Sequence, residues 1–217
     1  LSARSAGSNY SRQVNTLIGT KGVGLTSGYL YPGATYPYGM VQFTPSYFSK
    51  RSGFVINQLS GGGCEHMGNF PTFPVKGKLK MSPDNILNYR INISEEKGHA
   101  GYYEAMVQED IKAKLTVTER TGMASYEYPA DQQYGTVIIG GGISATPIEQ
   151  AAIVITAPNK CEGYAEGGNF CGLRTPYKVY FVAEFDTDAL ESGTWKRNEL
   201  KPNTTFAEGE YSGVFFT

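Results

Sequence analysis

Apolar and polar residues alternate along much of the chain, most regularly in its second half. The clearest run is residues 111–118, Ile-Lys-Ala-Lys-Leu-Thr-Val-Thr, in which every second residue is apolar. Successive side chains of a β-strand point to opposite faces, so this alternation predicts a strand with one buried and one solvated face. Similar patterns predict further strands over residues 39–43, 87–93, 102–107, 123–128, 136–139, 152–156 and 177–185.

The periodicity of an amphipathic helix is nearly absent. No apolar repeat with helical spacing lasts beyond about two turns, although a mean helix runs for roughly 11 residues. Turn residues such as Pro129-Ala130-Asp131 separate the predicted strands at the spacing of a sandwich, and residues 213–217 are again apolar and strand-like. We therefore predict an all-β fold, a twisted and mostly antiparallel β-sandwich with little helix.

Three glycine-rich segments interrupt these patterns, over residues 19–38, 60–74 and 159–176. Irregular segments longer than about 12 residues inside a compact domain are usually functional or disordered. The first two segments place prolines and glycines beside aromatic residues, a composition suited to rigid loops that present ring faces to a ligand. Sugar recognition is the use that this composition favours.

Composition and charge narrow the class of ligand. The 217 residues are enough for one large all-β domain, and 40% hydrophobic with 18% charged residues argues against disorder. The 19 basic and 20 acidic residues give a net charge of −1, so we expect a neutral ligand and no nucleic acid. No run approaches the roughly 18 apolar residues of a membrane span. The first eight residues contain no basic and apolar signal segment. They do not decide whether the protein is exported.

The cysteines and histidines do not form a recognisable metal motif. Cys161 and Cys171 allow two interpretations, a disulfide in an oxidising compartment or two small buried thiols. His66 and His99 are too few for a three-histidine zinc site, so we expect no metal site made by this chain alone. The glycine triplets at 61–63 and 140–142 lack the context of a phosphate or dinucleotide loop.

Most glycosidases need two carboxylates, one as acid and one as base or nucleophile. Nothing in the sequence brings two of the candidates together. Glu65 stands out because it lies in a glycine-rich loop between Cys64 and His66, where we expect ligand contact and not catalysis. Tyr29 and Tyr31 also lie in a loop, where they either stack on a sugar or join an ordinary core.

The order of the motifs resembles the opening of the family 92 glycoside hydrolases, calcium-dependent exo-α-mannosidases of mostly bacterial origin that include α-1,2-mannosidases. The motifs are VNTLIGT at residues 14–20, YPGATYPYGMVQFTP at 31–45 and LSGGGCEHMGN at 59–69. GHAGYY at 98–103 and VYFVAEFD at 179–186 continue the series. The resemblance thus runs from Val14 to Phe216.

The resemblance implies an N-terminal β-sandwich of the galactose-mutarotase-like super-sandwich type, packed on a larger helical barrel. Residues 1–13 would be a tail and 14–217 the sandwich domain, ending before its last strands and the barrel. The catalytic carboxylates and most Ca²⁺ ligands would belong to the barrel, so this chain would hold no catalytic residue and no metal. It would form one wall of a pocket in which a secreted or periplasmic bacterial enzyme hydrolyses terminal α-mannose from glycans with inversion. The fragment alone would be inactive.

The same resemblance selects five residues for substrate binding, and these are Tyr29, Tyr31, Gly63, Cys64 and Glu65. Three departures leave the sugar and linkage open. Lys21-Gly22-Val23-Gly24-Leu25 replaces a histidine-containing loop, Ile56-Asn57-Gln58 replaces His-Thr-His, and Gly68-Asn69 replaces Gly-Asp. The alternatives are a free-standing carbohydrate-binding or adhesion module without catalysis, and a structural domain that packs on another chain.

Overall fold

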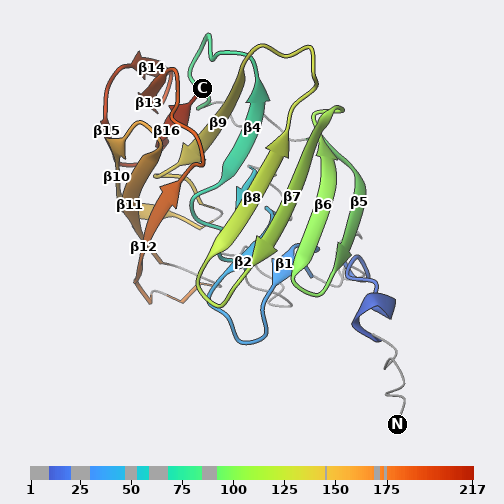
Figure 1. Cartoon of the computed structure of the whole chain (residues 1–217). Helices are drawn as coiled ribbons and strands as arrows, with labels where there is room; N and C mark the ends of the chain where they lie inside the picture. Colours follow the sequence, from blue (N-terminus) through green and yellow to red (C-terminus); the bar gives the residue numbers. More distant parts are fainter. Residues whose placement is uncertain are drawn as a thin grey trace, which may run out of the picture.

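The fold is built almost entirely from β-strands, as the computed structural model of the chain shows (Figure 1). It describes residues 10–20, 30–46, 53–58, 68–84, 92–144, 146–168, 172–173 and 175–217. A single turn of 3₁₀ helix, η1 (Tyr10–Gln13), precedes the strands of the described chain, and every strand pairing is antiparallel. No helix in the described ranges is long and apolar enough to cross a membrane. The predicted all-β, antiparallel sandwich with little helix is confirmed.

Three sheets make up the molecule. The largest has eight strands in the order β1 (Ala34–Thr35), β2 (Gln42–Pro45), β3 (Phe54–Val55), β4 (Thr72–Lys76), β9 (Gly135–Gly140), β16 (Ser212–Phe216), β13 (Ser192–Lys196) and β14 (Glu199–Pro202). A four-stranded meander follows the order β5 (Ile93–His99), β6 (Tyr102–Val107), β7 (Ile111–Val117) and β8 (Gly122–Glu127). The third sheet has the order β12 (Tyr177–Glu184), β11 (Lys160–Gly167), β10 (Ile148–Ala157) and β15 (Phe206–Glu208). Figure 1 shows β5–β8 on the right and β10–β12 on the left, with β4 and β9 between them.

Two hydrophobic clusters share the middle of the eight-stranded sheet. Ile138 belongs to the cluster under β5–β8, whereas its neighbour Ile139 belongs to the cluster under β10–β12. The same division separates Phe215 from Val214 in β16. Because adjacent residues of a strand point to opposite faces, β9 and β16 carry one core on each face. Trp195, the one tryptophan of the chain, is wholly buried in the first cluster.

The strand predictions with strong alternation are confirmed. In β7, Ile111, Ala113 and Leu115 are fully buried, while Lys112 and Lys114 face outward. β6, β8, β9, β10 and β12 also lie where alternation predicted strands. The strand predicted at 87–93 falls mostly outside the described residues, apart from Asn92 and Ile93.

All three of the long loops are shorter than predicted. The segment 159–176 contains β11, which pairs with β10 and β12. The segment 60–74 includes the start of β4, and the segment 19–38 contains β1. The pattern of alternation did not predict β11, because its inward positions hold only small residues such as Cys161, Gly163 and Ala165. Small side chains alternate weakly in hydrophobicity, although they suit a tightly packed sheet.

Cys161 is a free thiol buried in the second cluster, in agreement with the second of its two interpretations. Cys171 lies outside the described residues. Burial raises the pKa of the Cys161 thiol to about 12. The reactive form of cysteine is the thiolate, so burial suppresses both its formation and its accessibility.

We expect the Cys161 thiol to resist alkylation by iodoacetamide at about pH 8.5, where an ordinary thiol is half ionised. Peptide mapping by mass spectrometry distinguishes Cys161 from the other cysteines, and the same chain unfolded in guanidinium is the control. Equal labelling rates in the folded and unfolded chains would contradict the burial of this thiol.

Gly122 marks a close approach between two sheets. A Cβ at this first residue of β8 would lie 2.8 Å from Cδ1 of Phe43 in β2, so an added methyl group would press on the ring. Gly122→Ala should therefore lower the free energy of unfolding by about 1–3 kcal/mol, as overpacking does. In a Phe43→Leu background the ring is absent, and the same change should cost under about 1 kcal/mol. Urea unfolding of all four chains measures this coupling, and additive effects would argue against the contact.

Candidate functional site

Two asparagines join the ends of the segment 59–67, which lies outside the described residues. Asn57 follows β3, and Asn69 precedes β4. Asn57 Nδ2 donates to Asn69 Oδ1 at 2.9 Å, and the backbone N–H of Asn69 donates to Asn57 Oδ1 at 2.7 Å. Asn69 is completely buried, and Gln58, which follows Asn57 in the chain, is 3% exposed. These two hydrogen bonds hold the two ends of the segment 59–67 close together.

Two hydroxyl groups from other loops complete the arrangement. Asn69 Nδ2 donates to Tyr177 Oη at 3.2 Å, and Tyr177 Oη lies 3.2 Å from Thr146 Oγ1. Tyr177 begins β12, and Thr146 lies just before β10. We call Asn57, Asn69, Thr146 and Tyr177 the amide frame. It fastens together the bases of the β3–β4, β9–β10 and β11–β12 connections at one end of the molecule.

The amide frame contains no charged group. An amide both donates and accepts, so the two asparagines satisfy each other without an ion in a buried place. Buried polar networks whose members are all hydrogen-bonded make a structure rigid, because any displacement leaves a group unsatisfied. The frame is therefore suited to hold loops in position, and it contains no carboxylate that could act as the acid or base of a glycosidase.

The backbone that leaves the frame is strained. Gly68 has φ 132° and Phe70 has φ 53°, a left-handed value that costs a residue other than glycine on the order of 1–3 kcal/mol. Phe70 is 1% exposed, and its ring centroid lies 4.1 Å from that of Phe181. The packing of this ring holds the strained turn in place. Strained residues of this kind cluster at functional sites.

The first predicted loop is anchored separately. The backbone N–H of Leu30 donates to Gly19 O at 3.3 Å, which closes the segment 21–29, itself outside the described residues. Gly33 N–H donates to Thr44 Oγ1 at 3.1 Å. A Cβ on Gly33 would lie 2.2 Å from the Thr44 Cβ, so only glycine fits there. This close approach explains the glycine of the YPGAT motif.

Of the five residues predicted to bind substrate, the structure describes only Tyr31. Tyr29, Gly63, Cys64 and Glu65 lie outside the described residues. Tyr31 is half-buried and makes no hydrogen bond or ring contact with another residue of the described ranges. β1 and β3 both pair antiparallel with β2, so they run in the same direction. Tyr31 precedes β1 and Asn57 follows β3, so the two residues lie at opposite ends of these strands. The described residues therefore do not bring Tyr31 to the amide frame.

The amide frame itself was not predicted from the sequence. Its members are scattered over more than 100 residues, and each alone is an ordinary polar residue of a loop. One signal was present, because Asn57 and Asn69 both lie in segments that the resemblance described above singles out as departures. The structure shows that these two asparagines contact each other.

Metal and carboxylate chemistry are not found in this part of the molecule. Within the described ranges no three His, Cys, Asp or Glu side chains gather in a way that fits a metal ion. Burial raises the pKa of Asp84, which the Arg197 guanidinium opposes, but Asp84 lies before β5 and beside the β13–β14 turn, away from the frame. A Tyr102 hydrogen bond lowers the pKa of Glu104 on the outer face of β6.

Known proteins share this fold. The chain superposes on the family GH92 α-mannosidase BT3965 of Bacteroides thetaiotaomicron with a TM-score of 0.79 and 24% identity, covering 95% of this chain and 31% of that one. For the family GH92 inverting mannosidase BT2199 of strain VPI-5482 of that species, the TM-score is 0.77, with 22% identity over 95% of this chain and 29% of the other.

A relative from a fungus extends the comparison. The chain is 31% identical over 138 residues to an uncharacterized secreted glycosidase of Arthroderma benhamiae, which amounts to 54% of this chain and 17% of that protein. The chain thus spans less than a third of the length of each of these relatives. Residues 13–217 match the Glycosyl hydrolase family 92 N-terminal domain. Since that match covers nearly the whole chain and the all-β fold agrees with it, the chain belongs to this family of N-terminal domains.

Proposed function

We propose that this chain is the N-terminal domain of a secreted exo-α-mannosidase and forms one wall of its sugar-binding pocket. Family membership supports the glycosidase class, and the solved relatives named above are described as mannosidases. Secretion is supported by the fungal relative, which is described as a secreted glycosidase. The observation that carries the proposal is the amide frame, which fastens three loop bases at one end of the fold.

The frame's contribution would be positional. It would hold the segment 59–67 rigidly, so that Gly63, Cys64 and Glu65 meet the sugar in a preformed arrangement, with Tyr29 and Tyr31 offering ring faces. The amide frame beneath this segment has no charged group, so it forms hydrogen bonds without burying an ion. Preformed walls reduce the entropy lost when the substrate binds in a reactive pose.

The chemistry would come from the rest of the polypeptide. Glycoside hydrolysis with inversion needs one carboxylic acid to protonate the leaving oxygen and a second carboxylate to activate water. The described residues supply no such pair near the frame, and no three of their His, Cys, Asp or Glu side chains gather in a way that fits a metal ion. We therefore assign the carboxylates and the Ca²⁺ ligands to a C-terminal domain. In each solved relative more than two-thirds of the chain lies outside the match, which is enough for such a domain.

The activity is tested with the full-length protein and α-linked mannobiosides. We expect release of mannose that stops when a chelator removes Ca²⁺ and returns when Ca²⁺ is added. The 217-residue chain alone serves as the control and should release none. Failure of the full-length protein to cleave any α-mannoside, or cleavage by the chain alone, would count against the proposal.

The positional role of the frame is tested by Asn69→Ala in the full-length protein. Loss of this amide leaves Asn57 Nδ2 without its acceptor and leaves Thr146 Oγ1 as the remaining partner of Tyr177 Oη, which should cost about 1–3 kcal/mol of stability. Because the loop is then misplaced, kcat/KM for the mannobioside should fall about 10- to 100-fold.

Asn159→Ala is the matched control for this change. Asn159 Nδ2 donates to Phe185 O at 2.9 Å, where β11 begins and away from the frame, so its loss should affect stability alone. Both variants are assayed well below their melting temperatures. Equal kcat/KM values for the two variants would show that the frame serves only the stability of the fold.

A further inference from the structure

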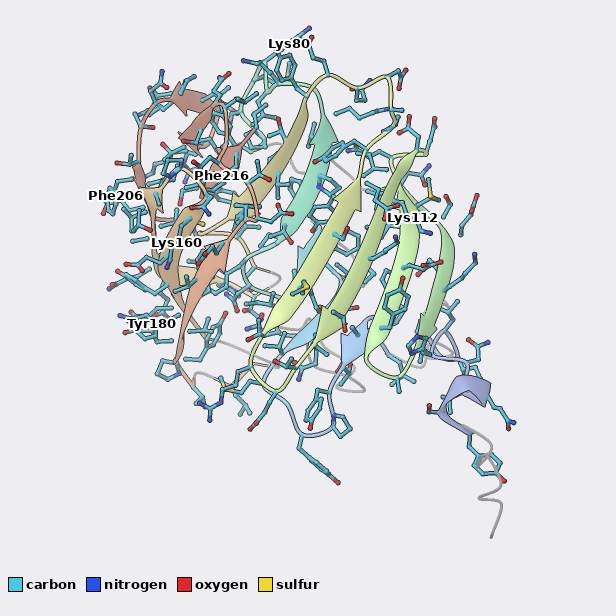
Figure 2. All side chains as sticks on the ribbon, viewed as in Figure 1. Lys80, Lys112, Lys160, Tyr180, Phe206 and Phe216 are labelled. Carbon is cyan, nitrogen blue, oxygen red and sulfur yellow. The ribbon has the colours of Figure 1, made fainter. Side chains whose placement is uncertain are left out.

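The outer face of the β10–β12 sheet is largely apolar, with Glu162 and Glu208 as the charged members of its two central rows, although its inner face already covers the second core. Two cross-strand rows run across β12, β11, β10 and β15. We call the six apolar members of these rows, Ala152, Val154, Tyr164, Tyr180, Val182 and Phe206, the outer apolar face. Tyr180 is 69% exposed, Val182 61% and Phe206 54%. Figure 2 shows Tyr180 and Phe206 at the outer surface of this sheet.

The meander β5–β8 provides an internal comparison, because it also packs one face on the eight-stranded sheet. Its outer face carries ion pairs of Lys114 with Glu127 and of Lys112 with Glu104. Figure 2 shows Lys112 on this face. An antiparallel sheet with one solvated face normally alternates apolar and polar residues, as this meander does. The β10–β12 sheet departs from that pattern, and sheets that are covered on both faces depart from it in the same way.

The outer apolar face has the shape and borders of a contact surface. It is hollowed by about 360 Å³, and of the described residues that line the hollow only Glu162 is charged. Ion pairs flank the rows on both sides, Lys160 with Glu184 and Lys178 with Glu166. A mostly apolar centre, here with one carboxylate at Glu162, and a charged rim are the usual composition of a surface that another protein surface covers.

We propose that the outer apolar face is covered by the polypeptide that follows Thr217 in the full-length protein. This inference rests on the proposed function, in which the chain is one domain of a larger enzyme. The solved relatives have more than two-thirds of their chains outside the matched domain, so a large body of protein must pack somewhere on it. Thr217 itself lies close to this sheet, since the ring of Phe216 is 4.8 Å from that of Phe185, directly after β12. A polypeptide leaving Thr217 therefore starts close to the end of β12.

Amide hydrogen exchange in the full-length protein and in the 217-residue chain tests the inference. β12 is an edge strand of the chain, so a covering segment should slow exchange of its amides at least about tenfold in the full-length protein. The edge strand β5 of the meander is the control and should exchange equally in both. Equal exchange of β12 in the two proteins overturns the inference.

Val182→Glu and Met123→Glu sharpen the test. Both side chains are exposed in the chain, Val182 by 61% and Met123 by 67%, and Met123 lies on the outer face of β8. Val182→Glu should remove the protection of β12 in the full-length protein, because it places a carboxylate under the covering segment, whereas Met123→Glu should leave the protection intact. Neither change should shift the melting temperature of the 217-residue chain. Equal behaviour of the two variants in the full-length protein overturns the inference.

A saccharide is the competing occupant, because the face carries three aromatic rings. Exchange of the 217-residue chain is therefore also measured with α-1,2-mannobiose, and protection of β11 and β12 by this sugar overturns the inference. The result is separable from the proposed function. Mannose release without protection of β12 rejects the inference alone, whereas protection of β12 without mannose release rejects the mannosidase proposal alone.

Discussion

The structure depends on the burial of β9 and β16 from both sides. A strand in a simple sandwich buries every second residue, but all five residues of β16 are buried, and β9 places Ile138 and Ile139 in different cores. The meander and the β10–β12 sheet have no strand in common. They are therefore joined through β9 and β16, which pack against both. The amide frame extends from this central element, since Gly140 N–H at the end of β9 donates to Pro71 O, two residues after Asn69. The candidate site is thus attached to the most deeply buried part of the fold.

The sequence was informative where hydrophobic contrast is strong. Residues 111–118 alternate between large apolar and charged or hydroxyl side chains, and their strand could be placed to within one residue. β11 could not be placed, because its buried positions are Cys161, Ala165 and Gly167, whose side chains are too small to produce the contrast. Three residues of β16 are apolar in succession, and such a run indicates burial without revealing that two separate cores share the strand.

The candidate site was less predictable for a different physical reason. Hydrogen bonds between side chains depend on the meeting of loops, and no local pattern encodes that Asn69 reaches Tyr177, 108 residues away. Resemblance to a family drew attention to the segments that contain Asn57 and Asn69 without relating these two residues to each other. Their relation is chemical, since a pair of amides remains neutral at any pH and tolerates complete burial. The roles predicted for Tyr29, Gly63, Cys64 and Glu65 stay predictions, as these residues lie outside the described ranges.

The two cores differ in one practical respect. The chain has a single tryptophan, and Trp195 is buried in the core beneath the meander, whereas Cys161 occupies the core beneath the β10–β12 sheet. Intrinsic tryptophan fluorescence therefore reports on one half of the molecule, and thiol accessibility reports on the other. A comparison of these two native probes distinguishes simultaneous melting of the halves from stepwise melting, without any dye, tag or engineered residue.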